Sequence, residues 1–292
     1  MMDDRRVGID EIRGVSSFTA QMQTFAGYAS NYLGPMLFRG EYGTGREFLA
    51  RIIHSMSSKD RGYFLKIRCH RLQRLADWDL TVRNHLLLFC AGRMPLPIHI
   101  IRRLIKTGCM TVSRELAGRR YLHTGRMLLT LFFDEVGFLD PQLQNAMYYI
   151  VRSGEQGPIQ REVKHWRIVF ASSYDLASQA HSGQFSSRLY DEINGLSLDF
   201  PPLRDRTSDI PALAYHFLNE VLAARNRAPG GFSEASLDFL LNYSWPGNVG
   251  ELKMSVARAC GRLALTSRLL DVTAFTDLVR QSRMIDLRMG VG

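Results

Sequence analysis

Compact apolar runs alternate with amphipathic segments through the first two thirds of the chain. Runs rich in large apolar or β-branched residues predict buried strands over residues 35–39, 64–69, 128–134 and 166–171. Directly after the first run, residues 47–55 carry apolar side chains at helical spacing. Buried strands that alternate with helices pack as a parallel sheet covered on both faces, so the pattern predicts an α/β domain.

The pattern changes to helices alone after residue 200. Helices are predicted over 210–225, 233–242 and 249–266, and Ser233 is placed to cap the start of the second. We therefore expect two domains, an α/β domain over residues 1–198 and an α-helical domain with a C-terminal tail over 199–292.

A glycine-rich segment separates the first predicted strand from the first predicted helix. Glycines at this spacing let backbone N–H groups curl around phosphate oxygens, and the helix N-terminus adds its positive end. The lysine expected after the last glycine is Arg46, whose planar guanidinium is a different donor from a compact ammonium. The alternative is a glycine-rich turn that no longer holds phosphate. The candidate phosphate-binding residues are Gly40, Glu41, Tyr42, Gly43, Thr44, Gly45, Arg46 and Glu47.

Two carboxylates end the apolar strand predicted over 128–134. Asp134 is the candidate ligand of Mg²⁺, and Glu135 is the candidate catalytic residue that polarises an attacking water. The alternative is a retained strand end whose carboxylates pair with Arg46 or Arg68.

Taken together and in this order, these segments resemble the AAA+ domain of bacterial sigma-54-dependent transcription activators, the enhancer-binding proteins. Residues 40–47 are similar to that family's GESGTGKE string and residues 131–136 to its LFLDEI string. The similarity runs from Gly14 to Gly261, and it includes the sensor I strand at 167–176, the PPLRER turn at 201–206 and the WPGNVREL motif at 245–252. The resemblance implies a P-loop domain of three αβα layers with a parallel central sheet, followed by a small all-α lid domain.

The resemblance also implies a role in transcription regulation with ATP and Mg²⁺ as ligands, but the chain departs from the family at the charged positions. The family's phosphate-loop lysine matches Arg46, and its second-strand asparagine matches Arg68. The sensor I Thr-Asn pair matches Ser172 and Ser173. The two arginine fingers match Ser186 and Glu192, and the sensor II arginine matches Gly250. Because arginine fingers contribute about 10³ to 10⁵ in turnover, the resemblance implies ATP binding with weak or absent hydrolysis and Glu135 as a residual catalytic residue.

The alternative function is a nucleotide-free pseudo-ATPase scaffold that acts by protein contact, for example by antagonising an intact AAA+ activator. Either reading is compatible with an oligomer, formed from copies of this chain or together with such an activator.

Positive charge is concentrated in one stretch of the chain. The formal net charge is +9, and residues 71–126 contain eleven Lys and Arg against three Asp and Glu. The family's sigma-contacting string GAFTGA is expected in this region and does not occur, which argues against contact with sigma-54 polymerase. Pro97 is placed to start a helix with Arg102, Arg103 and Lys106 on one face. That face is either solvated or a docking surface for an acidic partner or nucleic acid.

The sequence favours a cytoplasmic protein with no membrane contact. No apolar run approaches the length of about 18 residues that a membrane-spanning helix needs, and no apolar segment follows the charged residues at the N-terminus. Only 44 residues follow Asn248, and we expect the lid helices to use them, so no helix-turn-helix DNA-binding domain is expected.

Overall fold

A computed structural model describes most of the chain outside the basic stretch. The described residues are 8–32, 34–58, 63–71, 96–97, 110–112, 121–122, 129–156, 166–226, 230–262 and 269–275. The chain forms two compact units. The α/β unit comprises residues 1–11, 23–41 and 46–200, and the helical unit comprises 12–22, 42–45 and 201–292.

The α/β unit is built on a six-stranded sheet with the order β4-β2-β6-β7-β1-β8. Its strands are β1 (Met36–Gly40), β2 (Tyr63–Arg68), β4 (Met110–Val112), β6 (Leu129–Asp134), β7 (Trp166–Ser172) and β8 (Leu196–Phe200). Neighbouring strands are parallel except at one edge, where β4 runs antiparallel to β2. The predicted α/β fold with a mainly parallel central sheet is confirmed, and β4 is its antiparallel edge strand.

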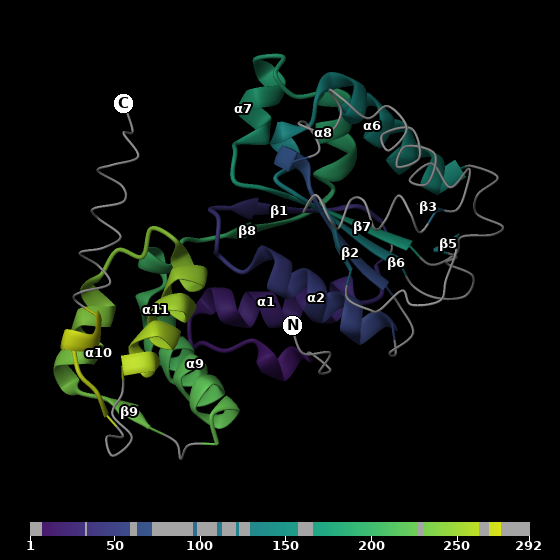
Figure 1. The fold of residues 1–292 in the computed structure, drawn as a ribbon. Coiled ribbons are helices and arrows are strands. Elements are labelled where there is room, and N and C mark those ends of the chain that lie inside the picture. The colour runs from purple at the N-terminus through teal and green to yellow at the C-terminus, as the bar shows by residue number, and fades with distance from the viewer. Residues whose placement is uncertain are drawn as a thin grey trace. The chain divides into compact units, whose positions relative to one another are not determined.

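Helices cover both faces of the sheet, as Figure 1 shows. Helix α2 (Arg46–Ser58) lies on one face, and α6 (Pro141–Gln156), α7 (Leu176–His181) and α8 (Ser187–Ile193) lie on the other. Because side chains alternate along a strand, Leu131 and Phe133 of β6 enter the core shared with α6 and α8. Phe132 points to the opposite face, where it stacks on Phe64, and Phe64 in turn contacts His54 of α2. The three-layer arrangement is therefore confirmed.

The helical unit packs three helices around its own core. Its elements after residue 200 are α9 (Ile210–Ala224), α10 (Glu234–Asn242), α11 (Asn248–Arg262), β9 (Gly231–Phe232) and β10 (Leu269–Leu270). Phe217, Trp245 and Leu252 are buried together, and the Ser233 hydroxyl accepts from the N–H of Ser236 as the predicted cap of α10. The expected all-α lid is corrected by one feature, since β9 and β10 form a short parallel pair.

A buried carboxylate fastens the start of α1 (Ser17–Ala29) within the helical unit. Asp209 is fully buried and accepts from the backbone N–H groups of Val15 and Ser16 at 2.6 and 2.7 Å and from the hydroxyls of Ser16 and Thr19. Short 3-10 turns complete the described elements: η1 (Ile9–Glu11), η2 (Val136–Phe138), η4 (Leu203–Asp205) and η5 (Thr207–Asp209). Asp209 thus holds the two residues that precede α1, and the Ser16 hydroxyl in turn accepts from the N–H of Thr19 in the first turn of the helix.

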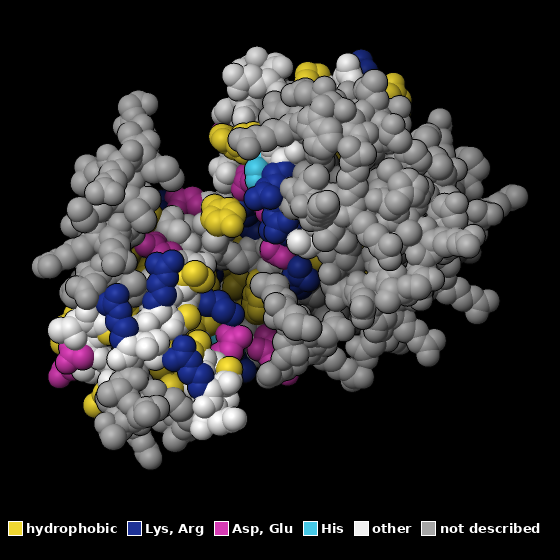
Figure 2. Space-filling view, viewed as in Figure 1, with side chains coloured by type: hydrophobic (Ala, Val, Ile, Leu, Met, Phe, Trp, Pro, Cys, Tyr) yellow, Lys and Arg dark blue, Asp and Glu magenta, His cyan; other side chains and the backbone are white. Residues whose placement is uncertain are grey.

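Basic side chains lie on the exposed surface of the helical unit, as Figure 2 shows. The exposed residues of α11 include Lys253, Arg258 and Arg262, and Lys253 forms an ion pair with Glu220 of α9 at 3.0 Å. No helix in the described part of the chain is long and apolar enough to span a membrane.

Within the basic stretch 71–126 the structure describes residue 71 and three short strands. Besides β4, these are β3 (Leu96–Pro97) and β5 (Tyr121–Leu122), which pair antiparallel. Pro97 therefore lies in a strand and not in the first turn of a helix, which corrects the sequence prediction there; the fixed φ of proline suits an extended edge as well as a helix start. Arg102, Arg103 and Lys106 lie outside the described residues.

Candidate functional site

The glycine-rich loop joins the end of β1 to the start of α2, as the sequence predicts for a phosphate-binding loop. Gly43 and Gly45 have backbone φ angles of +80° and +110°, which residues other than glycine rarely adopt. A Cβ atom on Gly43 would lie 2.3 Å from the carbonyl oxygen of Gly247, whereas beside Gly45 the space is open. Position 43 therefore requires glycine both for its positive φ and for the close approach of the Gly247 carbonyl, whereas position 45 requires it only for its positive φ.

Three successive carbonyls of this loop accept hydrogen bonds within the helical unit. The donors are Asn248 Nδ2 to Tyr42 O at 2.9 Å, the Gly250 N–H to Gly43 O at 3.2 Å and Arg206 Nη2 to Thr44 O at 2.7 Å. In a trans peptide the N–H of the next residue points away from the carbonyl, so the N–H groups of residues 43–45 face away from these donors. This is the orientation that an anion-binding loop requires.

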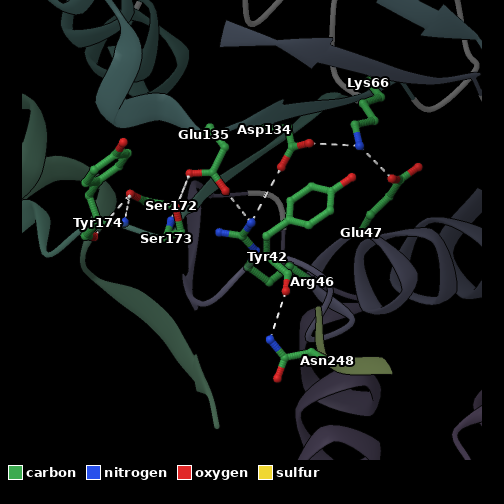
Figure 3. Close-up of polar contacts among 10 residues, drawn as sticks. All are labelled: Tyr42, Arg46, Glu47, Lys66, Asp134, Glu135, Ser172, Ser173, Tyr174 and Asn248. Atoms are coloured by element: carbon green, nitrogen blue, oxygen red, sulfur yellow. Dashed lines mark hydrogen bonds and ion pairs between the residues drawn. The ribbon is translucent and has the colours of Figure 1, made fainter. Parts of the chain in front are cut away.

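Arg46, the first residue of α2, reaches the two carboxylates at the end of β6. Its Nη2 donates to Glu135 Oε1 and lies 3.8 Å from Asp134 Oδ1 (Figure 3). The Arg46 side chain is only 4% exposed, and its Nη1 is buried without a hydrogen-bond partner among the described residues. The pairing of Asp134 and Glu135 with Arg46, one of the two sequence interpretations, is thus present in the structure.

Glu135 is held from both sides. It follows β6 with a left-handed backbone φ of 61°, and its Oε1 accepts from Arg46. Its other oxygen, Oε2, accepts from the backbone N–H and the hydroxyl of Ser173 at 2.9 and 2.8 Å. Ser173 follows β7, the neighbour of β6 in the sheet. Both carboxylate oxygens of the candidate catalytic residue are therefore engaged within the protein.

Lys66 supplies a second cation, which the sequence analysis did not single out. From β2, its Nζ lies 2.8 Å from Asp134 Oδ2 and 2.8 Å from Glu47 Oε2 (Figure 3). Burial alone lowers the pKa of the Lys66 ammonium, but the Glu47 and Asp134 carboxylates outweigh burial, and the pKa is raised above its ordinary value. The alternation of side chains along β2 could have indicated Lys66 as a partner of Asp134. Residues 64, 66 and 68 of β2 lie on the same face of the sheet as Asp134, the last residue of β6.

Glu47 completes the chain of ion pairs from the first turn of α2. Burial raises the pKa of its carboxyl, but Lys66 and Arg51 have the larger combined effect and lower it. Arg51, one turn further along α2, contacts Glu47 at 2.7 Å. Each of the three carboxylates Glu47, Asp134 and Glu135 thus contacts a cation of the protein.

The residues around Asp134 do not fit a magnesium ion as they are placed. Oδ2 of Asp134 contacts the Lys66 ammonium, and Oδ1 faces the Arg46 guanidinium. A divalent cation at this carboxylate would lie beside two positive groups, which a hard, carboxylate-bound cation disfavours. Within the described ranges, no three His, Cys, Asp or Glu side chains gather as a metal-binding group elsewhere.

The positions that match the family's arginine fingers have other contacts in this chain. The Ser186 hydroxyl caps α8 by accepting from the N–H of Leu189, and Glu192 forms an ion pair with Arg152 at 3.0 Å. Gly250, at the sensor II position, offers only its backbone N–H, which binds the loop carbonyl of Gly43.

Comparison with known proteins identifies the same segments. A family model described as the sigma-54 interaction domain matches residues 12–77, another with this description matches 104–203, and an AAA+ ATPase lid domain model matches 204–284. The Nif-specific regulatory protein of Herbaspirillum seropedicae is 31% identical over 86% of this chain and 42% of its own length. The transcriptional regulatory protein ZraR of Klebsiella oxytoca is 31% identical over 77% of this chain and 46% of its own length. The chain thus spans less than half the length of these two curated relatives.

Solved structures share the fold at lower sequence identity. NtrX from Brucella abortus in complex with ATP has a TM-score of 0.65 at 20% identity, over 93% of this chain and 55% of that structure. A lysine-to-arginine mutant of Thermotoga maritima RuvB has a TM-score of 0.56 at 14% identity, over 95% of this chain and 73% of that structure. At these identities the likeness supports the fold alone.

Proposed function

Because the chain belongs to the AAA+ family of sigma-54 interaction domains, we propose that it is a regulatory module of transcription control that binds ATP and hydrolyses it slowly or not at all. The observation that carries this proposal is the capture of Glu135 by Arg46 and Ser173.

Three features support nucleotide binding. The N–H groups of residues 43–45 face away from the donors that hold the loop carbonyls, and the open space beside Gly45 leaves room for a phosphate. Arg46 Nη1 is a buried donor without a partner in the described residues, and a phosphate oxygen is the acceptor that would satisfy it. The related fold of NtrX has been solved in complex with ATP and with ADP.

The engaged state of Glu135 supports slow hydrolysis. A general base must contact the attacking water, and both carboxylate oxygens of Glu135 already accept hydrogen bonds, one from a guanidinium and the other from an amide and a hydroxyl. A positioned general base contributes about 10² to 10⁴ in rate, so we expect ATP hydrolysis to be slower by up to this factor when Glu135 does not act as the base. Ser186 and Glu192 supply no cation for the phosphates of a neighbouring subunit, which removes a further contribution.

We propose that such a module acts by assembly, with copies of itself or with an intact AAA+ activator. Nucleotide binding without turnover would favour one assembled state without a hydrolysis cycle. The sequence lacks the GAFTGA string, so the proposal does not include remodelling of sigma-54 polymerase.

A second candidate is a nucleotide-free scaffold, and the ion pairs of the site favour it. Arg46 and Lys66 satisfy Asp134 and Glu135 without any ligand, so the site is electrostatically complete by itself. For this candidate, mixing the chain with an intact activator should change the ATPase rate of that activator. An unchanged rate at stoichiometric excess would contradict it.

Calorimetric titration of the purified chain with ATP, followed in the same sample by a phosphate-release assay, separates the two candidates. Binding with little or no phosphate release supports the proposed function. Phosphate release at the rate of an intact activator overturns slow turnover, and no binding at millimolar ATP overturns nucleotide binding in favour of the scaffold.

A further inference from the structure

A protein ammonium lies at the carboxylate where a magnesium ion is expected. Lys66 Nζ contacts Oδ2 of Asp134 at 2.8 Å, and its side chain and that of Asp134 are 10% and 8% exposed. The contact is therefore a largely buried ion pair and not a solvated surface pair.

Lys66 is held in this place by a second carboxylate from another element. Glu47 Oε2, in the first turn of α2, contacts the same Nζ at 2.8 Å, and Arg51 in turn contacts Glu47. A divalent cation at Asp134 would have to displace this ammonium or lie beside it, with Arg46 Nη2 also 3.8 Å from Oδ1. Positive charges this close together repel one another, so a divalent cation competes poorly for Asp134.

From this arrangement we infer that Lys66 takes the place of the divalent cation and that the domain binds the polyphosphate of a nucleotide as its metal-free anion. The inference rests on the proposed nucleotide binding.

The electrostatics of the site account for this preference. Two carboxylates beside a phosphate-binding loop repel phosphate unless cations lie with them, and in magnesium-dependent sites the metal supplies this charge. Here the Lys66 ammonium neutralises Asp134 and the Arg46 guanidinium neutralises Glu135. The negative charge of these carboxylates is therefore balanced before the phosphates bind. Arg46 Nη1 remains as the buried donor for a phosphate oxygen.

The first test compares ATP binding to the unmodified chain in EDTA and in excess Mg²⁺ by calorimetry. We expect the affinity in EDTA to equal or exceed that in Mg²⁺, because magnesium withdraws metal-free ATP from solution. Affinity that falls by more than about tenfold in EDTA overturns the inference while leaving the proposed function intact. Absence of binding in both buffers overturns the proposed function itself.

A second test uses Lys66→Met, which keeps the apolar stem and removes the charge. We expect ATP binding by this variant to weaken by about tenfold or more in EDTA and to recover in Mg²⁺, because Asp134 is then available to the metal. Lys66→Arg should keep metal-independent binding. Lys253→Met removes a lysine from the exposed pair with Glu220 and serves as the matched control, with no change in either buffer expected. A Lys66→Met variant that folds and still binds equally in both buffers contradicts the role of Lys66.

Discussion

Ser173 donates both its backbone N–H and its hydroxyl to one oxygen, Oε2, of Glu135. The serine follows β7 and the glutamate follows β6, so the contact joins the ends of two adjacent parallel strands. Ser173, which the sequence resemblance matches to a sensor position, therefore holds one oxygen of the candidate catalytic carboxylate, and Arg46 holds the other.

Arg46→Lys should raise the rate of phosphate release. A lysine ammonium is a compact donor on an unbranched stem and does not reproduce the guanidinium fork, so Oε1 of Glu135 becomes available to a water molecule. We expect release to rise by about tenfold, a part of the 10² to 10⁴ that a positioned base contributes. A coupled phosphate assay measures the rate.

Two controls accompany this variant. Adding Glu135→Gln to Arg46→Lys should return the rate to that of the unmodified chain. Arg39→Lys changes an arginine in the exposed pair with Asp199 and should leave the rate unchanged. Equal rates for Arg46→Lys and the unmodified chain would argue against Arg46 as the group that restrains Glu135.

Gly45→Asp should abolish nucleotide binding. The φ of +110° strains any side chain, and a carboxylate at this position faces the phosphates across open space. We expect ATP affinity to fall by about a hundredfold or more in calorimetry. Gly261→Asp, at an exposed glycine of α11 with equal room for a side chain, should bind ATP normally. Unchanged affinity in a folded Gly45→Asp variant would contradict the assignment of the loop.

Asn248 should be a stability determinant of the helical unit. It is fully buried with a φ of 53°, and its side chain accepts from the N–H of Leu203 and donates to the Tyr42 carbonyl. Asn248→Gly keeps the conformation and loses both bonds, which we expect to cost about 2 to 3 kcal/mol of unfolding free energy. Asn248→Ala adds backbone strain of about 1 kcal/mol. Denaturant unfolding measures both, and a more stable alanine variant would contradict the strain.

The elements that the sequence predicts well are those with a strong local pattern. The runs that became β1, β6 and β7 agree with the structure within one residue, and the amphipathic segment of α2 agrees within three. Helix α1 was not predicted, because Ser17–Ala29 has a weak apolar stripe and its start is fixed by Asp209, which lies far away in the sequence.

The candidate site is predictable in its motifs but not in its pairings. Local spacing identifies the glycine loop and the carboxylates Asp134 and Glu135, since these follow strands directly. The contacts of Lys66 and Ser173 depend on which strands are neighbours in the sheet, and strand order is not a local property. Arg167 shows the same limit, because this strand residue is fully buried and donates to backbone oxygens of Tyr32, Ser30 and Ile53.

The basic stretch 71–126 carries a separate prediction from its charge. If Arg102, Arg103 and Lys106 form a docking surface for nucleic acid, retention on DNA or heparin should weaken steeply with salt, because each neutralised phosphate releases counterions. Replacing all three by glutamine should reduce the slope of the salt dependence by about two to three units. Retention that is insensitive to salt and to these changes would indicate a solvated face with no anionic partner.

The ion pairs of Glu47 and Lys66 should make stability depend on pH in opposite directions. The pKa of Glu47 is lowered below its ordinary value of 4.5 in the folded chain, so its contribution is fully present above about pH 4.5 and is lost as the pH falls through the folded pKa. The pKa of Lys66 is raised above 10.5, so its contribution is fully present below about pH 10.5 and is lost as the pH rises through the folded pKa. Thermal unfolding of the unmodified chain and of Glu47→Gln across the acid range measures the first effect. The difference between their melting temperatures should narrow as the pH falls below about 4.5, and a constant difference would show that Glu47 is not ionised in this network.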